Sequence, residues 1–392
     1  MRKGWTYRKL GDVCDVINGL WTGKKEPFIN VAVIRNTNFT KDCKLKLDDV
    51  AYLDVETKQF SSRKLKPGDI IIEKSGGSEK QPVGRAVLFD ISDGDYSFSN
   101  FTATLRIKEE ANINPSFLHR CLYCHYVKGE TLNMQPKTTG LHNLDMKAFL
   151  RLPVPNLSLA EQERIVVELD LLQGIIDKQK AQLKELETLA QSIFYDMFGS
   201  ISERVPLSYY AVSFYGGKSL AGDEECSNKV LKTGAVTYDY FRGDDVKFLP
   251  TDYCPREEDK VRAGDLLISR MNTAELVGAC AFVWDVNDNI YLPDRLWRVN
   301  LKDNANPVFI WKAMIQQQAK EQIRGLASGT SGTMKNISKP KLMSVTIPFV
   351  SISLQTQFAK KIETIEKQKI LIKSSIAETQ KLFDYTMDKY FG

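Results

Sequence analysis

The sequence has few of the residues and motifs on which enzymes depend. Only three of its 392 residues are histidines, His119, His125 and His142, and all lie in the first half. It contains no G-x-x-x-x-G-K-[ST] phosphate loop, no G-x-G-x-x-G dinucleotide turn, and no Asn-Pro-Pro or Asp-Pro-Pro motif of the amino-methyltransferase kind. We therefore expect a chain without catalytic residues, without a cofactor and without a metal ion.

Long apolar runs and a disulfide framework are also missing. No stretch approaches about 18 consecutive apolar residues, so no membrane span is expected. The charged N-terminus is not followed by an apolar run, so no signal peptide is expected either. Seven irregularly spaced cysteines suit a reducing compartment. These features predict a cytoplasmic protein, and the net charge of +5 favours nucleic-acid binding only weakly.

Two short motifs could carry chemistry. Cys121-Leu-Tyr-Cys124-His125 has the spacing of covalent haem attachment, with zinc as an alternative. Haem attachment belongs to exported proteins, and the segment is expected to be helical, so buried thiols are favoured. Asp69 and Glu73 have the residue types of a nuclease site, but the second half replaces Glu73 with a serine. We therefore predict that Asp69, like Asp265, serves a turn before a strand.

The most informative feature is an internal repeat with a period of about half the chain. Segments of the first half recur in the second in the same order, at a nearly constant offset of about 192–197 residues. The paired segments are 10–19 with 207–216, 66–72 with 262–268, 84–90 with 278–285, 114–118 with 306–310, 158–162 with 353–357 and 197–199 with 390–392. A gene duplication accounts for this order.

Each half begins with about 150 residues of alternating short elements. Apolar runs bordered by Gly, Asp or Asn predict strands at 69–72, 86–89 and 102–107, and at 265–268, 281–284 and 296–301. An Asn-Pro pair precedes a predicted helix in each half, at 115–127 and 307–324. The fold class is thus α+β, with two duplicated globular α/β domains, at 1–156 and 200–351.

Each half ends in a long predicted helix, at 157–199 and at 352–392. Residues 159–197 contain no proline and only one glycine, and Ser158 with Glu161 forms a capping box at their start. Ser353 is the predicted N-cap of the second helix, and Gly199 and Gly392 end the two helices. Apolar residues alternate in steps of three and four. The predicted seam consists of Ile165, Leu169, Leu172, Ile176, Leu183, Leu186, Ile193, Ile362, Ile365, Ile372, Ile376 and Phe383.

The length of these helices bears on how they pack. A helix of about 39 residues extends roughly 58 Å, and no domain of 150 residues buries one stripe along that length. We expect the two helices to pack on each other, with Gln179, Lys369 and Thr379 as polar positions that select one register. The alternative is that each helix docks on its own domain. Val166, Ile175 and Leu189 beside the seam predict either a partner surface or such docking.

Two similar domains joined by long helices suit a target with two separated sites, of which duplex DNA is the commonest. Polar loops at matching positions carry side chains that reach phosphates and base edges. In the first half the candidate contacts are Arg35, Asn36, Asn38, Lys74, Ser75, Ser78, Lys80, Gln81, Thr138, Thr139, His142 and Asn143. In the second half they are Lys232, Thr233, Ser269, Arg270, Asn272, Thr273, Ser331, Thr333 and Lys335.

With these residues the chain resembles the specificity subunit (HsdS) of type I restriction–modification systems. The resemblance covers essentially the whole chain and is carried by 67–71, 75–78, 82–85 and 138–143, and by the helix starts at 159–165 and 354–359. The second half departs from the pattern. Residues 271–274 replace the Gly-Gly loop and 355–358 replace an acidic helix start, so its DNA contacts are less sharply defined.

The resemblance implies a function. Each domain would be a target-recognition domain that binds one half of an asymmetric, bipartite site in double-stranded DNA. The helices would pack as an antiparallel coiled coil, set the spacer, and form the platform for two methyltransferase (modification) subunits, which bring S-adenosylmethionine. Restriction and translocase subunits would complete the complex. Alternatives are a two-headed protein-binding scaffold, a stand-alone DNA-modifying enzyme with unfamiliar motifs, and a spare or phase-variable subunit.

Overall fold

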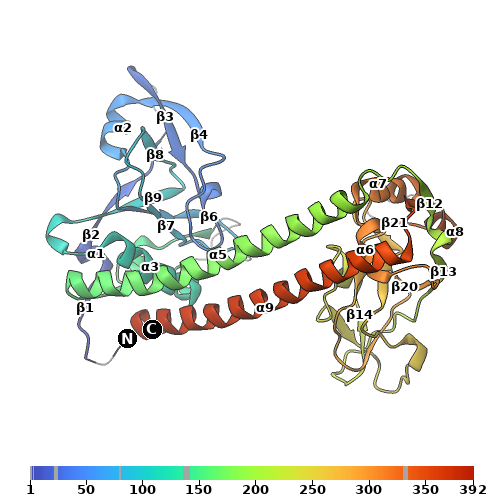
Figure 1. The fold of residues 1–392 in the computed structure, drawn as a ribbon. Coiled ribbons are helices and arrows are strands. Elements are labelled where there is room, and N and C mark those ends of the chain that lie inside the picture. The colour runs from blue at the N-terminus through green and yellow to red at the C-terminus, as the bar shows by residue number, and fades with distance from the viewer. Residues whose placement is uncertain (1, 3, 22–24, 79–80, 136–141, 330–333) are drawn as a thin grey trace. The chain divides into compact units, whose positions relative to one another are not determined.

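The computed structural model describes residues 2, 4–21, 25–78, 81–135, 142–329 and 334–392. The chain is mixed α/β and forms two compact units (Figure 1). Unit 1 comprises residues 1–180 and 374–392, and unit 2 comprises residues 181–373. Two 40-residue helices, α5 (Leu159–Phe198) and α9 (Ile352–Phe391), each contribute one part to either unit. In the part that the structure describes, no helix is long and apolar enough to span a membrane.

Unit 1 is built on two sheets. The larger has the order β2 (Cys14–Asn18), β9 (Thr102–Ile107), β5 (Asp69–Glu73), β7 (Ala86–Phe89), and all neighbours are antiparallel. The smaller has the order β4 (Ala51–Glu56), β3 (Phe28–Ile34), β8 (Tyr96–Phe98), with β3 and β8 parallel.

Shorter elements complete unit 1. Two-stranded ribbons pair β1 (Tyr7–Lys9) with β11 (Pro153–Pro155), and β6 (Ser75–Gly77) with β10 (His142–Asn143). The helices are α1 (Leu10–Val13), α2 (Thr57–Arg63), α3 (Pro115–Val127) and α4 (Met146–Phe149), with 3-10 turns η1 (Asn36–Asn38), η2 (Glu109–Ala111) and η3 (Glu130–Met134).

Unit 2 has the same strand order, element for element. Its larger sheet runs β13 (Ala211–Tyr215), β20 (Leu296–Leu301), β16 (Leu266–Ser269), β18 (Cys280–Phe282), and its smaller sheet runs β15 (Val246–Phe248), β14 (Lys229–Leu231), β19 (Ile290–Tyr291). The ribbons pair β12 (Arg204–Pro206) with β22 (Thr346–Pro348), and β17 (Met271–Asn272) with β21 (Lys335–Asn336). The remaining elements are α6 (Pro307–Met314), α7 (Gln317–Leu326), α8 (Lys339–Met343), η4 (Leu207–Tyr209), η5 (Thr233–Val236) and η6 (Glu257–Asp259).

The central strand of each larger sheet is covered on both faces. In β5, Ile70 and Ile72 pack in one cluster with α3, whereas Ile71 packs in another with the smaller sheet. In β16, Leu266 and Ile268 face one cluster and Leu267 the other. A strand that is buried on both faces has an unbroken apolar run, which explains the runs Ile70–Ile72 and Leu266–Ile268 in the sequence.

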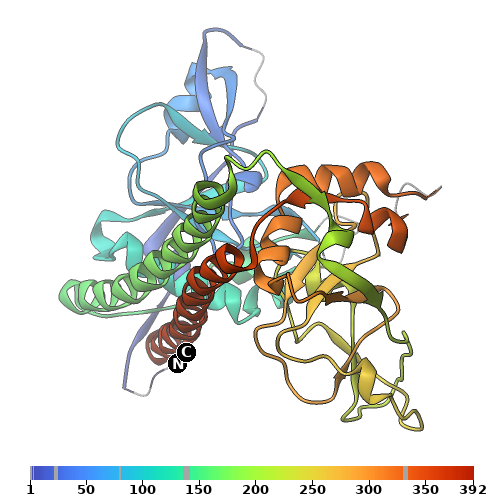
Figure 2. The same cartoon turned by 45° about the vertical axis from the view of Figure 1, so that its right-hand side comes forward.

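The predicted helix at 307–324 is wrong in one respect, because two helices occupy it (orange in Figure 2). Gln316 has extended backbone (ψ 146°) and separates α6 from α7. Seven of the eight residues of α6 are buried, whereas α7 buries only Ala319 and Ile323, so the two segments have different packing demands. The predicted N-cap Ser353 is also wrong: α9 begins at Ile352, and Gln355 N donates to Ser351 O. The capping box of Ser158 and Glu161 is confirmed.

Within each unit the parts of α5 and α9 run in opposite directions. In unit 1 Arg164 contacts Tyr390, and Gln179 Nε2 donates to Ser375 Oγ at 2.7 Å. In unit 2 Lys369 Nζ lies 2.6 Å from Glu187 Oε2, and the rings of Phe198 and Phe358 are 5.1 Å apart. All twelve side chains of the predicted seam are buried or half-buried, and the polar positions Gln179 and Lys369 have partners on the other helix.

Candidate nucleic-acid interface

The ribbon β6–β10 brings together two loops that are about 65 residues apart in the sequence. His142 pairs with Gly77 and Asn143 with Ser75, and Ser75 Oγ donates to Asn143 Oδ1 at 2.5 Å. Gly76 has a φ of +97°, which favours glycine, and a Cβ on Gly77 would lie 2.7 Å from Val83. The two glycines therefore allow the tight ribbon that presents these polar side chains.

The turn η1 joins the same cluster from the end of β3. Asn36 Nδ2 lies 3.4 Å from Ser75 O and 3.4 Å from Glu73 Oε1. Lys74 is adjacent, and its Nζ donates to Asn18 Oδ1 at 3.0 Å, while burial lowers the pKa of this amine. Three segments that are distant in the sequence thus place amide, hydroxyl and ammonium groups in one region of unit 1.

A buried ion pair lies beneath this region. Arg85 Nε and Nη2 contact Glu73 Oε2 and Oε1 at 2.8 and 2.9 Å, and the side chains are 5% and 2% exposed. Burial lowers the pKa of Arg85, but the hydrogen bonds and charge of Glu73 more than offset this, and the net effect raises the pKa. A hollow of about 490 Å³ opens above the pair, and its walls include Asn36, Ser78 and Gln81.

Unit 2 places its predicted loops on the corresponding ribbon, β17–β21. Asn272 pairs with Lys335 in this ribbon. Asn272 Nδ2 lies 3.5 Å from Thr237 Oγ1, just after η5, which parallels the contact of Asn36 with Ser75. The guanidinium of Arg270 lies 5.4 Å from the ring centroid of Trp297, and Lys335 Nζ donates to Gly329 O at 3.1 Å.

Several predicted contacts need correction. Asn38 is buried, its Oδ1 accepts from Arg35 N and its Nδ2 donates to Asp49 O, so its amide holds the turn together. Ser269 is fully buried, and its hydroxyl donates to Met271 O at 3.2 Å. Neither side chain is offered to a ligand. Five others lie outside the described residues: Lys80, Thr138, Thr139, Ser331 and Thr333.

Arg35 and Lys232, which precede the turns η1 and η5, make weaker contacts with the rest of the fold. Arg35 Nη2 donates to Asp49 O at 3.2 Å and lies 3.7 Å from Asp49 Oδ2, and Lys232 Nζ lies 3.9 Å from Asp245 Oδ1. Both side chains are partly exposed. Thr233, which follows Lys232, is half-buried, and Thr273, which follows Asn272, is exposed. The two ion pairs are long and their cations are partly exposed, so they are weak enough to be exchanged for a ligand.

Sequence reasoning missed two features of the region. Arg85 was taken only as part of a motif, although it contacts Glu73 and the loops on either side. In unit 2, Tyr238 and Tyr240 are exposed and stacked, with ring centroids 6.2 Å apart and the guanidinium of Arg242 5.5 Å from Tyr238. Their alternation in Thr237-Tyr-Asp-Tyr is the signal that could have identified them.

The other motifs have structural roles. Cys121 and Cys124 are buried, which raises the pKa of both thiols, and His125 is bound through Nδ1 to Glu130 (2.8 Å) and through Nε2 to Pro153 O (3.2 Å). Among the residues that the structure describes, no group of three His, Cys, Asp or Glu could hold a metal ion. The prediction of buried thiols is confirmed.

The predicted turns at Asp69 and Asp265 are confirmed. Asp69 Oδ2 accepts from Lys66 N at 2.8 Å, and Asp265 Oδ2 from Arg262 N at 2.9 Å. Each aspartate also pairs with an arginine of the neighbouring strand, Arg106 at 2.7 Å and Arg298 at 2.9 Å. Because Asp69 and Glu73 lie at opposite ends of β5, they do not form one carboxylate site.

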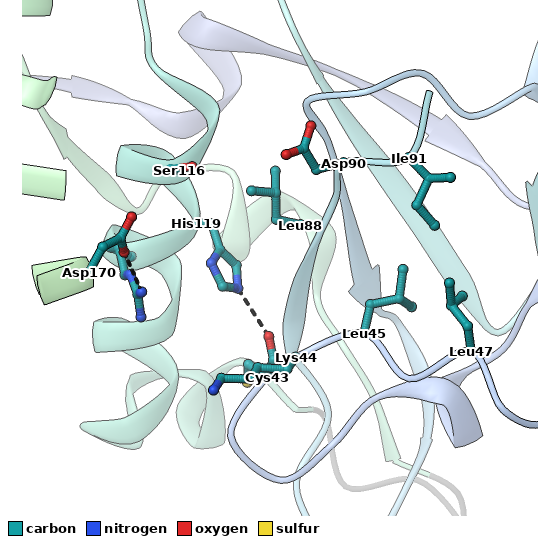
Figure 3. Close-up of a pocket in the computed structure, with 11 residues that line it drawn as sticks. Cys43, Lys44, Leu45, Leu47, Leu88, Asp90, Ile91, Ser116, His119 and Asp170 are labelled. Carbon is teal, nitrogen blue, oxygen red and sulfur yellow. Dashed lines mark hydrogen bonds and ion pairs between the residues drawn. The ribbon is translucent and has the colours of Figure 1, made fainter. Parts of the chain in front are cut away.

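A second hollow of unit 1, of about 400 Å³, lies between the loop at 43–47, α3 and α5 (Figure 3). His119 points from α3 to the carbonyl of Cys43, and its Nε2 lies 3.1 Å from both Cys43 O and Ala86 O. Burial lowers its pKa to about 4, assisted by the charge of Arg120. His119 is therefore neutral and donates from Nε2, which is a structural role.

The chain is similar to known specificity proteins of type I restriction–modification systems. Residues 2–188 match the family described as type I restriction modification DNA specificity domain. The chain is 24% identical, over 427 aligned positions, to the EcoKI specificity subunit of Escherichia coli (strain K12), with 99% of this chain and 89% of that protein covered. The S subunit of a type I restriction–modification system from M. genitalium has the same fold, with a TM-score of 0.60 at 15% identity over 100% and 98% of the two chains.

A further solved structure is similar over 100% of this chain and 98% of its own, with a TM-score of 0.55 at 18% identity. It was described as the structural basis of complex assembly and conformational transition in a type I restriction–modification system. The solved structures establish the fold, and the family match covers the part of the chain that contains unit 1's ribbon and turn η1.

Proposed function

Because the chain belongs to the family of type I restriction–modification specificity subunits (HsdS), we propose that it reads a bipartite, asymmetric DNA site with one recognition domain on each half-site. The proposed recognition domains are residues 1–156 and 200–351. Each is followed by a segment, 157–199 or 352–392, which contains α5 or α9. DNA binding follows from membership of the family, and the reading of two half-sites is the finer step of this proposal.

One observation carries the proposal. Two units with the same strand order each gather their polar loop residues on a two-stranded ribbon, β6–β10 or β17–β21, next to the turn that follows β3 or β14. Paired strands of this kind can enter the major groove of DNA, where side-chain amides read adenine and arginine reads guanine. A duplicated fold with diverged ribbons is what an asymmetric site requires.

The two ribbons differ in chemistry. The proposed contacts of unit 1 are rich in amides and hydroxyls: Arg35, Asn36, Lys74, Ser75, Ser78, Gln81, His142 and Asn143. Those of unit 2 contain more cationic groups: Lys232, Thr233, Arg270, Asn272, Thr273 and Lys335. Amides suit A·T pairs and an arginine suits G·C pairs, so the two half-sites are expected to differ in composition.

The helices would set the spacer between the half-sites as an antiparallel coiled coil. A helix of 40 residues extends about 60 Å, which exceeds the 34–36 Å of one turn of duplex DNA. The pairs Gln179–Ser375 and Lys369–Glu187 support a single register, because a shift of one helix along the other would separate both pairs.

The helices would also carry the two methyltransferase subunits. Ile175 and Leu189 are 45% and 47% exposed, as a partner surface requires, whereas Val166 is only 8% exposed and packs within unit 1. Of the two alternatives for Val166, packing within the chain is therefore the one that its burial supports. In this proposal the methyltransferase subunits supply S-adenosylmethionine and the catalytic groups, restriction and translocase subunits join them, and this chain is non-catalytic.

The test is a genome-wide map of N6-methyladenine in cells that carry this gene with its methyltransferase partner. We expect a bipartite motif with a fixed spacer that is absent when this gene alone is deleted. Arg270→Ala should relax one half of the motif, and Asn143→Ala should relax the other. Identical maps with and without the gene, or relaxation of both halves by either variant, would contradict the proposal.

A further inference from the structure

We propose that Arg85 is a positioning residue for base discrimination by unit 1: it contacts no DNA itself but holds Gln81 and Asn36 in the orientation in which they read the half-site. This inference rests on the proposed function and adds a residue and a mechanism to it. The guanidinium of Arg85 contacts three separate segments of unit 1.

The first contact is the two-point ion pair with Glu73, at the end of β5. The second is with turn η1: Arg85 Nη1 donates to Phe39 O at 2.7 Å, and Nη2 donates to Asn36 O at 3.2 Å. The third is with Gln81. With its amide oriented so that the oxygen faces the guanidinium, that oxygen lies 2.7 Å from Arg85 Nη2. Arg85 thereby links all three segments.

These contacts with Arg85 fix the direction in which the side-chain amides of Gln81 and Asn36 point. When Gln81 accepts through its oxygen, its NH₂ group must point away from Arg85, and the hollow above the pair is lined by Gln81, Asn36 and Ser78. Asn36 is held through its own carbonyl by Arg85, and its Nδ2 approaches Glu73 and Ser75. Amide groups read adenine only when donor and acceptor are both correctly placed.

Unit 2 shows that the backbone does not need this arginine. In unit 1 Gly84 N donates to Glu73 O, and Glu73 N donates to Arg85 O. In unit 2 Gly278 N donates to Ser269 O, and Ser269 N donates to Ala279 O, which are the equivalent bonds. The residues in place of Glu73 and Arg85 are thus Ser269 and Ala279, which cannot form an ion pair. The strands of unit 2 pair in the same way without an ion pair at this position. The Arg85–Glu73 ion pair of unit 1 therefore serves the side chains above the sheet.

In unit 2 the corresponding turn, η5, is held by a residue of its own loop. Arg242 Nη2 donates to Gly234 O and lies 3.0 Å from Asp245 Oδ2, and all three residues belong to one loop. Among the described residues, neither of these two contacts of Arg242 reaches the ribbon β17–β21. The effect of removing Arg85 should therefore be confined to one half-site, which a general loss of stability would not produce.

Lysine is the informative replacement. It keeps the positive charge for Glu73, but its single ammonium cannot reproduce the planar set of donors that contacts Glu73, Asn36 and Gln81 together. Arg106→Lys is the matched control, because Arg106 makes an equally short two-point pair with Asp69 at the other end of β5, away from the ribbon. It tests whether loss of any arginine–carboxylate pair in unit 1 has the same effect.

The experiment uses the full chain bound to its methyltransferase subunits and duplexes that carry the motif found by methylation mapping. Competing duplexes have one base pair replaced at each position in turn. We expect Arg85→Lys to reduce discrimination about tenfold or more at one or two positions of a single half-site, the amount that one two-point base contact contributes. Discrimination in the other half-site should stay unchanged, and Arg106→Lys should leave both unchanged.

Gln81→Ala keeps the buried pair and removes the side chain that it holds. It should lose discrimination at the same positions, and combining it with Arg85→Lys should add little, because both act through one contact. If Arg85→Lys does not fold, Gln81→Ala and Asn36→Ala decide instead: unaltered discrimination in both overturns the inference. It is also overturned if Arg85→Lys loosens both half-sites equally or if Arg106→Lys matches it. A wild-type chain without a bipartite motif would instead overturn the proposed function.

Discussion

Units 1 and 2 agree in the contacts that join each domain to its helix. Gln162 of α5 is fully buried, accepts from Asn114 N at 2.8 Å and donates to Asn112 O and Leu157 O. Gln355 of α9 does the same with Asn306 N, also at 2.8 Å, and with Asn304 O and Val350 O. The units differ at the ribbon and beneath it, so the frame is shared and the proposed reading surface has diverged.

A second difference lies inside the frame. The place of His119 is taken in unit 2 by Trp311, whose Nε1 donates to Asp239 O at 2.9 Å and to Cys280 O at 3.0 Å. Both side chains thus bind two carbonyls through one N–H group. The comparison also supports the Nε2–H tautomer of His119, because an indole nitrogen can only donate. One unit has a titratable group at this position and the other does not.

The largest effect should come from the shared glutamines. Gln162→Ala and Gln355→Ala each leave buried backbone groups unpaired, so each should lower the free energy of unfolding by about 2–4 kcal/mol. Denaturant unfolding of the two variants measures this, with Gln173→Ala as control, because the half-buried Gln173 makes only a surface hydrogen bond, to Asp177. A large effect of only one variant would contradict the equivalence of the contacts that Gln162 and Gln355 make between helix and domain.

A smaller effect should come from pH. The folded-state pKa of His119, about 4, lies below its ordinary value of 6.5, so the unfolded state takes up the proton first. Stability is therefore full above pH 6.5 and falls as the pH drops from 6.5 to about 4, by about 1–3 kcal/mol. In thermal unfolding at pH 7 and pH 5, His119→Gln should show a smaller difference than the wild-type chain. An unchanged pH dependence would contradict the assignment.

The smallest effect should come from a single surface cation. Lys74→Ala and Lys335→Ala should each weaken DNA binding at low salt without changing the preferred bases. Each should reduce the slope of log affinity against log salt by about one, since one phosphate contact is lost. A salt titration with the motif duplex measures this. A change in the preferred bases would show that the residue reads bases.

Much of the fold could be predicted from the sequence. The strands at 69–72 and 102–107 and the helix at 115–127 are confirmed with little or no shift in their bounds, because apolar periodicity and an Asn-Pro start are local signals. The break at Gln316 was missed, since α6 and α7 are both compatible with a helix and only their different burial separates them. Helix ends were less predictable, as Ser353 shows.

The candidate site was predictable only as a set of loops. The residue types and the repeat predicted polar segments near 36, 75, 143, 272 and 335. They come together at two ribbons only because strands about 65 residues apart in the sequence pair with each other. Asn38 and Ser269 are of the same residue types as the candidate contacts Asn36 and Ser75, and only the folded chain turns their side chains inward.

From the sequence alone we could predict that the chain is an internal duplication, that each copy ends in a long helix, and that the strands of each domain recur in one order. These properties follow from periodicity and spacing, which act over a few residues at a time. The tertiary structure decided which polar side chains meet, which are buried, and that Arg85 links three segments of one unit. Such contacts form between residues far apart in the chain, so their geometry exists only after the sheets have paired.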